Sequence, residues 1–260
     1  MCGRYTDDAE LSEIRLSFDV ETVELYRDWK PTYNITPSYG PGFEQLMVVR
    51  TREGKRALRL GRFWMIPPGW NKPLKELPTT FNARAEELAG KRWWKEAFAS
   101  RRCLIPATGW REFRPEAGKK QPYHFHLGRK LFAFAGLYSS TTTDDGEVVD
   151  SFAIITTAPS PLAAPIHDRM PLVLAPELYG PWLGTEDDPS RVLEQARSLA
   201  LGMPLDVYPS DPIANSSRYE GPRALDAVSR DPLATGPLGA TPAPVQGELF
   251  GNVPAKPRRA

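Results

Sequence analysis

Long apolar runs and abundant cysteine are missing from this chain. Two cysteines among 260 residues are too few for the disulfide framework of a small secreted protein. The apolar runs, such as LFAFAGLY at 131–138, are strand-length and too short to span a membrane. The first residues, MCGRYTDDAE, lack the basic and apolar regions of a secretory signal. We therefore expect a cytoplasmic protein whose cysteines serve another purpose than disulfide bonding.

An excess of charge of one sign is also missing. The chain has 33 basic and 32 acidic residues, for a net charge of +1. This balance excludes a uniformly basic nucleic-acid-binding protein, but it allows a local basic groove, because binding follows the local potential. The 41% hydrophobic and 25% charged residues are typical of a globular domain with one substantial core.

Sequence periodicity predicts more strands than helices. Strand patterns lie at 46–51, 57–64, 102–107, 122–127, 131–138 and 148–157. Helix patterns lie at 7–18, 83–100 and 189–202. Asn82 stands where the second helix would have its N-cap, and the proline-rich stretches 30–41 and 65–78 are predicted to be irregular. This order predicts an α+β protein with a mostly β core and peripheral helices.

The composition changes from about Asp226. Residues 226–260 are rich in Pro, Gly and Ala and poor in large apolar residues, so they are predicted to be a disordered tail after a domain at 2–225. Inside the tail, Gln246 is followed by Leu249 and Phe250. This pattern resembles the short bacterial motif that docks into the replicative sliding clamp, as two apolar anchors in a flexible segment can fold into a groove. A chance pentapeptide is the alternative.

Cysteine at position 2 is the first feature that suggests chemistry. Removal of Met1 requires a small second residue, and Cys2 would then carry both an α-amine and a thiol, with ordinary pKa values of roughly 7.7–8.0 and 8.5. Such a pair can attack an acyl group, or it can condense with an aldehyde to an imine that the thiol closes into a thiazolidine. Position alone does not choose between these two chemistries and an incidental cysteine.

Five further segments add to MCGRY. They are YNITPS (33–38), PPGWNKP (67–73), TFNARAEEL (80–88), CLIPATGWREF (103–113) and APIHDRMPLVL (164–174). In this order they resemble the SRAP family, the SOS-response-associated peptidases, over about residues 2–225. The resemblance implies one barrel-like, mostly antiparallel α+β domain that crosslinks to abasic sites in single-stranded DNA through a thiazolidine. It also implies association with the nucleoid, and lyase and autoproteolytic activities.

The resemblance implies four catalytic residues. Cys2 is the crosslinking nucleophile, which fits the substrate because an abasic deoxyribose opens to an aldehyde. Asn82 positions the terminal residue and the sugar. Glu112 lies beside the terminal amine, where a carboxyl group can move the protons that imine formation requires. His167 transfers a proton at the sugar, a role that suits an imidazole.

The resemblance also implies a DNA-binding groove. Arg4 and Arg84 match positions that line it, and Trp70 matches an aromatic residue that stacks on bases beside the lesion. Family members often carry a second aromatic residue next to that one, but this chain has Asn71. Stacking there is therefore expected to be weaker or differently placed.

Other residues near these motifs have more than one interpretation. Thr156 aligns with a polar residue near the sugar, and Thr157 competes with it. Lys72 and Arg169 are either phosphate contacts or framework contacts.

Without the family, simpler interpretations hold for several residues. Asn82 is then a helix cap, and Glu112 a solvated carboxylate on a strand. His124 and His126 share one face of a strand, but no third ligand is evident, so no metal site is predicted. Cys103 precedes an apolar run and is predicted to be a buried strand residue.

Two other functions compete with abasic-site capture. One is a cysteine peptidase or amidotransferase that uses Cys2 on acyl substrates. The other is a non-covalent reader of damaged or modified DNA, which needs no nucleophile. We expect no cofactor, and a monomer that binds abasic single-stranded DNA.

Overall fold

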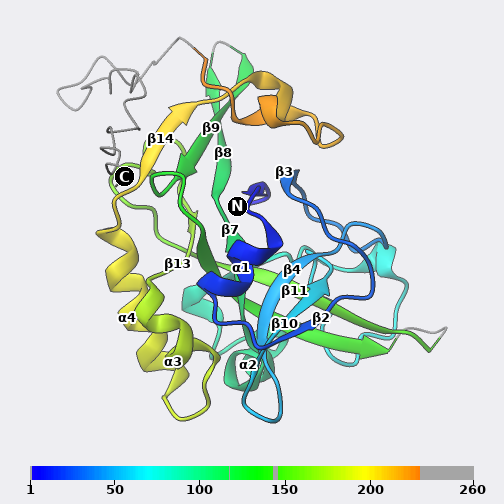
Figure 1. Cartoon of the computed structure of the whole chain (residues 1–260). Helices are drawn as coiled ribbons and strands as arrows, with labels where there is room; N and C mark the ends of the chain where they lie inside the picture. Colours follow the sequence, from blue (N-terminus) through cyan, green and yellow to red (C-terminus); the bar gives the residue numbers. More distant parts are fainter. Residues whose placement is uncertain (1, 117, 143–145, 229–260) are drawn as a thin grey trace, which may run out of the picture. The chain divides into compact units, whose positions relative to one another are not determined.

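The computed structural model describes residues 2–116, 118–142 and 146–228, which form two β-sheets with peripheral helices. The α+β prediction is confirmed. One sheet is antiparallel and lies in the upper part of Figure 1. In spatial order it contains β14 (Asp206–Pro209), β9 (Lys119–His126), β8 (Gly109–Glu116), β1 (Tyr5–Asp7) and β3 (Thr32–Ile35).

The other sheet is larger and mostly antiparallel. Its order is β12 (Met170–Pro171), β11 (Val148–Thr157), β10 (Phe132–Thr142), β7 (Arg102–Ala107), β4 (Gln45–Arg50), β5 (Arg56–Gly61) and β2 (Thr22–Glu24). Two more strands join it from the side: β13 (Val173–Leu174) pairs with β10, and β6 (Asn82–Arg84) pairs with β11. Both strand orders end at open edges, so the described residues form two open sheets rather than a closed barrel.

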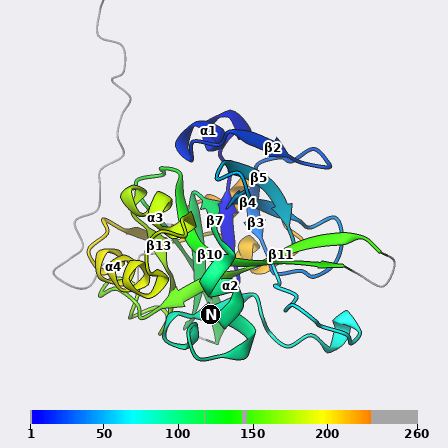
Figure 2. The ribbon, with the colours of Figure 1, turned by 90° about the horizontal axis from the view of Figure 1, so that it is seen from below.

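The described residues contain four α-helices. They are α1 (Leu11–Ser17), α2 (Arg92–Ser100), α3 (Tyr179–Leu183) and α4 (Pro189–Leu201). Figures 1 and 2 show α3 and α4 side by side, with α3 against β7 and α4 against β13. Asp188 caps α4 by accepting a hydrogen bond from the backbone N–H of Ser190, and Pro189 fits the first helical position. Within the described residues, no helix is long and apolar enough to cross a membrane.

Short 3₁₀ turns complete the connections. They are η1 (Leu74–Glu76), η2 (Ala85–Glu87), η3 (Pro176–Leu178), η4 (Pro212–Asn215) and η5 (Pro222–Leu225). The stretch 65–78 is irregular apart from η1, as predicted. Past residue 225, Ala227 pairs with Ser210, and the backbone N–H of Val228 donates to Pro209 O. The tail motif of Gln246, Leu249 and Phe250 lies outside the described residues.

Two helix predictions are wrong in their extent. Only 92–100 of the predicted helix at 83–100 is α-helical, and the N-cap residue of this helix is Lys91 rather than Asn82. Asn82–Arg84 is instead a strand, because its backbone pairs in parallel with Ile154–Thr156. The predicted helix at 7–18 is reduced to α1, since β1 takes the residues up to Asp7.

The stretch 30–41 is only partly irregular. It contains β3, whose Ile35 and Thr32 pair with Tyr5 and Asp7 of β1. The six predicted strands are all present, although β5, β9 and β10 each differ from the predicted bounds by several residues at one end. Sheet pairing with distant segments thus overrides local propensity at these positions.

An aromatic cluster joins the two sheets. Trp110 of β8 is fully buried and stacks on Phe125 of β9, with ring centroids 5.0 Å apart and an interplanar angle of 8°. Phe134 of β10 meets Trp110 edge-on at 6.0 Å and Tyr5 of β1 at 5.9 Å. Such edge-on pairs add stability beyond their buried area, and they fix β1 and β8 against the larger sheet.

Gly109 starts β8 where no side chain fits. A Cβ atom at this position would lie 2.5 Å from the ring of His124 and 2.7 Å from the carbonyl oxygen of Phe125. The second contact is with backbone, so rotation of a side chain cannot relieve it. The absence of a side chain lets β8 and β9 pair closely just before Glu112.

We predict that Gly109→Ala destabilises the protein by about 1–3 kcal/mol, the usual cost of overpacking. Urea unfolding measures the change. Gly90→Ala is the matched control, because a Cβ there meets nothing within 4 Å and the variant should unfold within about 0.5 kcal/mol of the parent chain. Equal stability of the two variants would contradict the close packing of β8 on β9.

Candidate active site

The pairing of β1 with β8 brings Cys2 beside Glu112. Tyr5 lies opposite Trp110, and the backbone N–H of Arg111 donates to Arg4 O at 2.9 Å. Continuing this antiparallel register places Glu112 opposite the residue next to Cys2. Cys2 is fully buried. Burial, and then the nearby charge of Glu112, raise the pKa of the Cys2 thiol well above its ordinary value.

Glu112 is a buried acid rather than a solvated strand carboxylate. Its relative exposure is 3%, and burial raises its pKa to about 8. Its Oε1 atom is buried and has no hydrogen-bond partner among the described residues. The carboxyl group is therefore mostly protonated at neutral pH and can act as an acid.

His167 faces Glu112 from a segment inserted between two strands. The pairing of β10 with β11 ends at Gly136 and Ile154. Beyond that point the two strands separate, and residues 170–174 lie between them, with β12 paired to β11 and β13 paired to β10. This insertion holds the preceding His167 with its Nε2 atom 3.8 Å from Glu112 Oε2. Burial lowers the pKa of the His167 ring, so the ring is mainly neutral at neutral pH.

The other ring nitrogen of His167 has two kinds of neighbour. The backbone N–H of Arg169 donates to Nδ1 at 3.0 Å, which suits the neutral ring. Asp168 Oδ1 lies 3.1 Å from the same atom, which suits the charged ring. Both protonation states are thus supported, as proton transfer requires.

Asn82 presents an unpaired acceptor. Its Nδ2 atom donates to Phe81 O at 3.1 Å and to Ile154 O at 3.5 Å, so the amide is held against β11. Its Oδ1 atom is buried and has no partner among the residues that the structure describes. A buried acceptor left unpaired costs free energy, and a hydroxyl group of a ligand would remove that cost.

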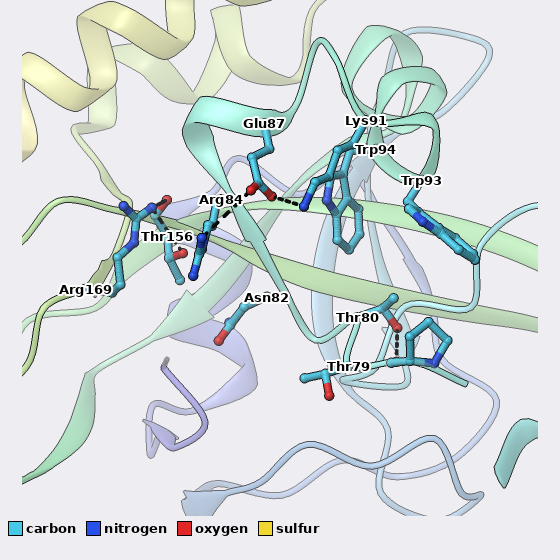
Figure 3. A pocket seen from close by; sticks show the side chains of 11 residues that line it. Thr79, Thr80, Asn82, Arg84, Glu87, Lys91, Trp93, Trp94, Thr156 and Arg169 are labelled. Atoms are coloured by element: carbon cyan, nitrogen blue, oxygen red, sulfur yellow. Dashed lines mark hydrogen bonds and ion pairs between the residues drawn. The ribbon is translucent and has the colours of Figure 1, made fainter. Parts of the chain in front are cut away.

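Asn82 lies in a pocket of about 380 Å³ (Figure 3). The pocket is lined by Pro78, Thr79, Thr80, Asn82, Arg84, Glu87, Lys91, Trp93, Trp94, Thr156 and Arg169. Cys2, Glu112 and His167 do not line it. The site therefore has two parts, a buried group of titratable side chains and an open pocket, which the segment from His167 to Arg169 connects.

Charges of both signs meet in this pocket. Glu87 lies 2.7 Å from Lys91 Nζ and 3.9 Å from Arg84 Nη1, and Figure 3 shows the three side chains converging. Arg169 makes framework contacts, because it pairs with Glu86 at 2.9 Å and donates to Thr156 O at 2.6 Å. Two cations, Arg84 and Lys91, thus share one carboxylate at the pocket wall.

The predicted DNA-binding residues separate into two groups. Arg84 and Thr156 line the pocket, whereas Arg4 and Trp70 lie outside its lining. The guanidinium of Arg4 donates to Asn34 Oδ1 at 3.1 Å and to Ala214 O at 2.9 Å, so it holds a distant segment of the chain. Trp70 is half-buried against an apolar cluster.

Seven of the lining residues were not predicted. Four of these seven are Glu87, Lys91, Trp93 and Trp94. The sequence places them in one predicted helix, which would have distributed them around its circumference. The strand at 82–84 and the turn after it bring them to one wall instead.

Cys103 and the two histidines His124 and His126 do not line this pocket. Cys103 is fully buried on β7, as predicted. His124 and His126 lie close together, with ring centroids 5.8 Å apart, next to Tyr208. Across the described ranges, no group of three or more His, Cys, Asp or Glu side chains is placed to hold a metal ion.

This geometry can be compared with known proteins. The family model described as SOS response associated peptidase (SRAP) matches residues 1–215. The chain belongs to the SRAP family. It is 31% identical over 230 residues to the abasic site processing protein YoqW of Bacillus subtilis, a match that covers 87% of this chain and all of that protein.

Other SRAP relatives are similar over most of the chain. The abasic site processing protein YedK of Escherichia coli is 30% identical over 203 residues, which cover 76% of this chain and 86% of that protein. A solved structure from Bacteroides thetaiotaomicron has the same fold, with a TM-score of 0.73 and 20% identity. That match covers 87% of this chain and all of the solved chain.

The raised pKa of Glu112 predicts a pH-dependent stability. The carboxyl group titrates near about 4.3 in the unfolded chain and about 8 in the folded one. Its contribution to the free energy of unfolding is therefore fully present below the pKa of the unfolded chain, and it is lost as the pH rises through the pKa of the folded chain. Glu112→Gln removes this loss. The free energy of unfolding of the variant, relative to that of the parent chain, should therefore rise by a few kcal/mol from pH 5 to pH 9, at about 1.4 kcal/mol per pKa unit.

Urea unfolding at several pH values checks this expectation. The exposed Glu177 provides the control, since Glu177→Gln should keep the pH dependence of the parent chain. If the Glu112→Gln and parent curves run parallel from pH 5 to 9, Glu112 is not the buried acid described above.

Proposed function

We propose that this SRAP protein captures abasic sites in single-stranded DNA as a thiazolidine formed by Cys2 after removal of Met1. The observation that carries the proposal is the buried group in which Cys2 adjoins Glu112 and Glu112 faces His167. The relatives named as abasic site processing proteins support the substrate class.

The reaction is a condensation that releases water. The α-amine of Cys2 attacks the aldehyde carbon of the opened sugar and forms a C–N bond. Glu112, protonated at neutral pH, gives its proton to the departing hydroxyl group, and an iminium remains. The thiol sulfur then bonds to the same carbon and its proton returns to Glu112, so the overall change is aldehyde plus aminothiol to thiazolidine plus water.

His167 and Asn82 act on the sugar in this proposal. The abasic sugar is mostly a closed ring, and opening it requires transfer of the hydroxyl proton. His167 can pass that proton because both of its protonation states have neighbours. The unpaired Oδ1 atom of Asn82 accepts a hydroxyl proton of the sugar and holds it in place.

Acyl transfer is the weaker alternative. The thiolate is the reactive form of cysteine toward acyl groups, and the raised pKa of Cys2 keeps the thiol protonated. An aldehyde is attacked first by the amine, so a protonated thiol does not prevent capture. The buried environment therefore favours the aldehyde chemistry over a peptidase or amidotransferase.

Intact-protein mass spectrometry tests the proposal. The untagged protein is mixed with a single-stranded oligonucleotide that carries one abasic site. We expect an adduct with the mass of protein without Met1 plus oligonucleotide minus one water, mapped to Cys2. Cys2→Ala should abolish the adduct, and Cys103→Ala should retain it, because Cys103 lies inside β7 and its backbone nitrogen is an amide rather than a free amine.

Absence of an adduct on a protein that exposes Cys2 at its N-terminus would overturn capture. Binding without an adduct would then support a non-covalent reader, and acylation of Cys2 by amide or ester substrates would support the peptidase alternative.

Glu87 provides a second prediction, on DNA affinity. Its carboxylate neutralises Lys91 and opposes phosphate at the pocket wall. Glu87→Gln should tighten binding to abasic single-stranded DNA a few-fold and steepen its dependence on salt, because an additional cation becomes available to a phosphate. Fluorescence anisotropy at several salt concentrations measures both effects.

The control is Glu96→Gln on α2, since Glu96 pairs with Arg101 and does not line the pocket. It should leave affinity and salt dependence unchanged. Weaker binding by Glu87→Gln would show that Glu87 positions the cations rather than opposing the DNA.

A further inference from the structure

Trp93 is a large aromatic side chain that the core does not use. It lies in the first turn of α2 and is 42% exposed. The buried residues of this helix are Trp94, Ala97 and Phe98, whose spacing of three and four makes one apolar face. Trp93 lies off that face, so packing of the helix does not account for it.

The exposed ring borders the pocket that holds Asn82. Trp93 lines this pocket, and Figure 3 shows it at the opposite side from Arg169, with Asn82 between them. Its ring centroid is 6.1 Å from that of Trp70, at an interplanar angle of 44°. Trp70 in turn packs on the buried cluster of Ile66, Leu77 and Val149, so the pair has a fixed base.

Polar and positive groups lie around the aromatic face. Thr79 and Thr80 line the pocket beside Asn82, and Arg84 and Lys91 contribute positive charge to its wall. An aromatic face next to cations and hydroxyl groups matches the parts of a nucleotide, which are a flat base, a phosphate and a sugar.

We propose that Trp93 is a binding residue that stacks on the nucleobase next to the abasic site. The inference rests on the proposed function. An abasic nucleotide has no base, so it offers nothing to stack on, and binding energy for the strand must come from its neighbours. Stacking on Trp93 would hold the neighbouring base at the pocket rim while the sugar enters toward Asn82.

The test removes the neighbouring bases and the tryptophan separately. One oligonucleotide has an abasic site between ordinary nucleotides, and the other has the same site between base-free tetrahydrofuran spacers. For the parent chain, we expect the concentration that gives half-maximal crosslinking rate to rise about tenfold on the second oligonucleotide, as the loss of one stacked base implies. For Trp93→Ala, we expect this concentration to be equally high on both oligonucleotides.

Two variants serve as controls. Trp93→Phe keeps an aromatic face and should restore most of the difference between the oligonucleotides. Leu16→Ala removes another exposed apolar side chain, one that is 81% exposed on α1, and should behave as the parent chain. The maximal crosslinking rate should be the same in all of these variants, since none of them touches the reacting atoms.

The proposal is overturned if Trp93→Ala still distinguishes the two oligonucleotides as the parent chain does. It is also overturned if Trp93→Ala lowers the affinity for both oligonucleotides by the same factor, because an equal loss indicates a structural role rather than stacking. If the parent chain forms no adduct at all, the proposed function fails instead. Anisotropy with the same two oligonucleotides then decides the role of Trp93 separately.

Discussion

The position of β1 between β8 and β3 is the constraint on which the site depends. It joins the N-terminal residues to a sheet from both sides, and Tyr5 anchors the strand by edge-on contacts with Phe63 and Phe134. A shift of one residue in this pairing would turn every side chain of β1 to the opposite face. The register therefore sets how the N-terminal residues, Cys2 included, lie against Glu112.

This placement has a cost in stability that is concentrated at the site. Glu112 is buried with one oxygen unpaired, and Asn82 leaves a buried acceptor without a partner among the described residues. Burial raises the pKa of Glu112 and of Cys2, and the ionised form of one disfavours that of the other. At neutral pH the two groups are therefore neutral together, as the proposed condensation requires.

The sequence was sufficient for six of the fourteen strands in the described part of the chain, because the apolar runs of strands such as β7, β10 and β11 reflect burial on both faces. It could not predict β6, since Asn82–Arg84 is followed by a good helical pattern and becomes a strand only by pairing with Ile154, 72 residues away. The four proposed catalytic residues came from the family resemblance and not from spacing. The guanidinium of Arg4 also holds Asn34 and Ala214, and its DNA-binding role stays a prediction.

The near-neutral charge of the chain bears on how the lesion would be found. With a net charge of +1, general attraction to DNA is weak, and Glu87 already pairs with the pocket cation Lys91. Phosphate contacts cannot by themselves distinguish an abasic strand from an intact one. In the proposed function, selectivity therefore comes from the aldehyde, which only the lesion offers to Cys2, and affinity comes from the bases beside it. An exposed aromatic face at the pocket rim, as Trp93 provides, is the kind of group that such a division of roles requires.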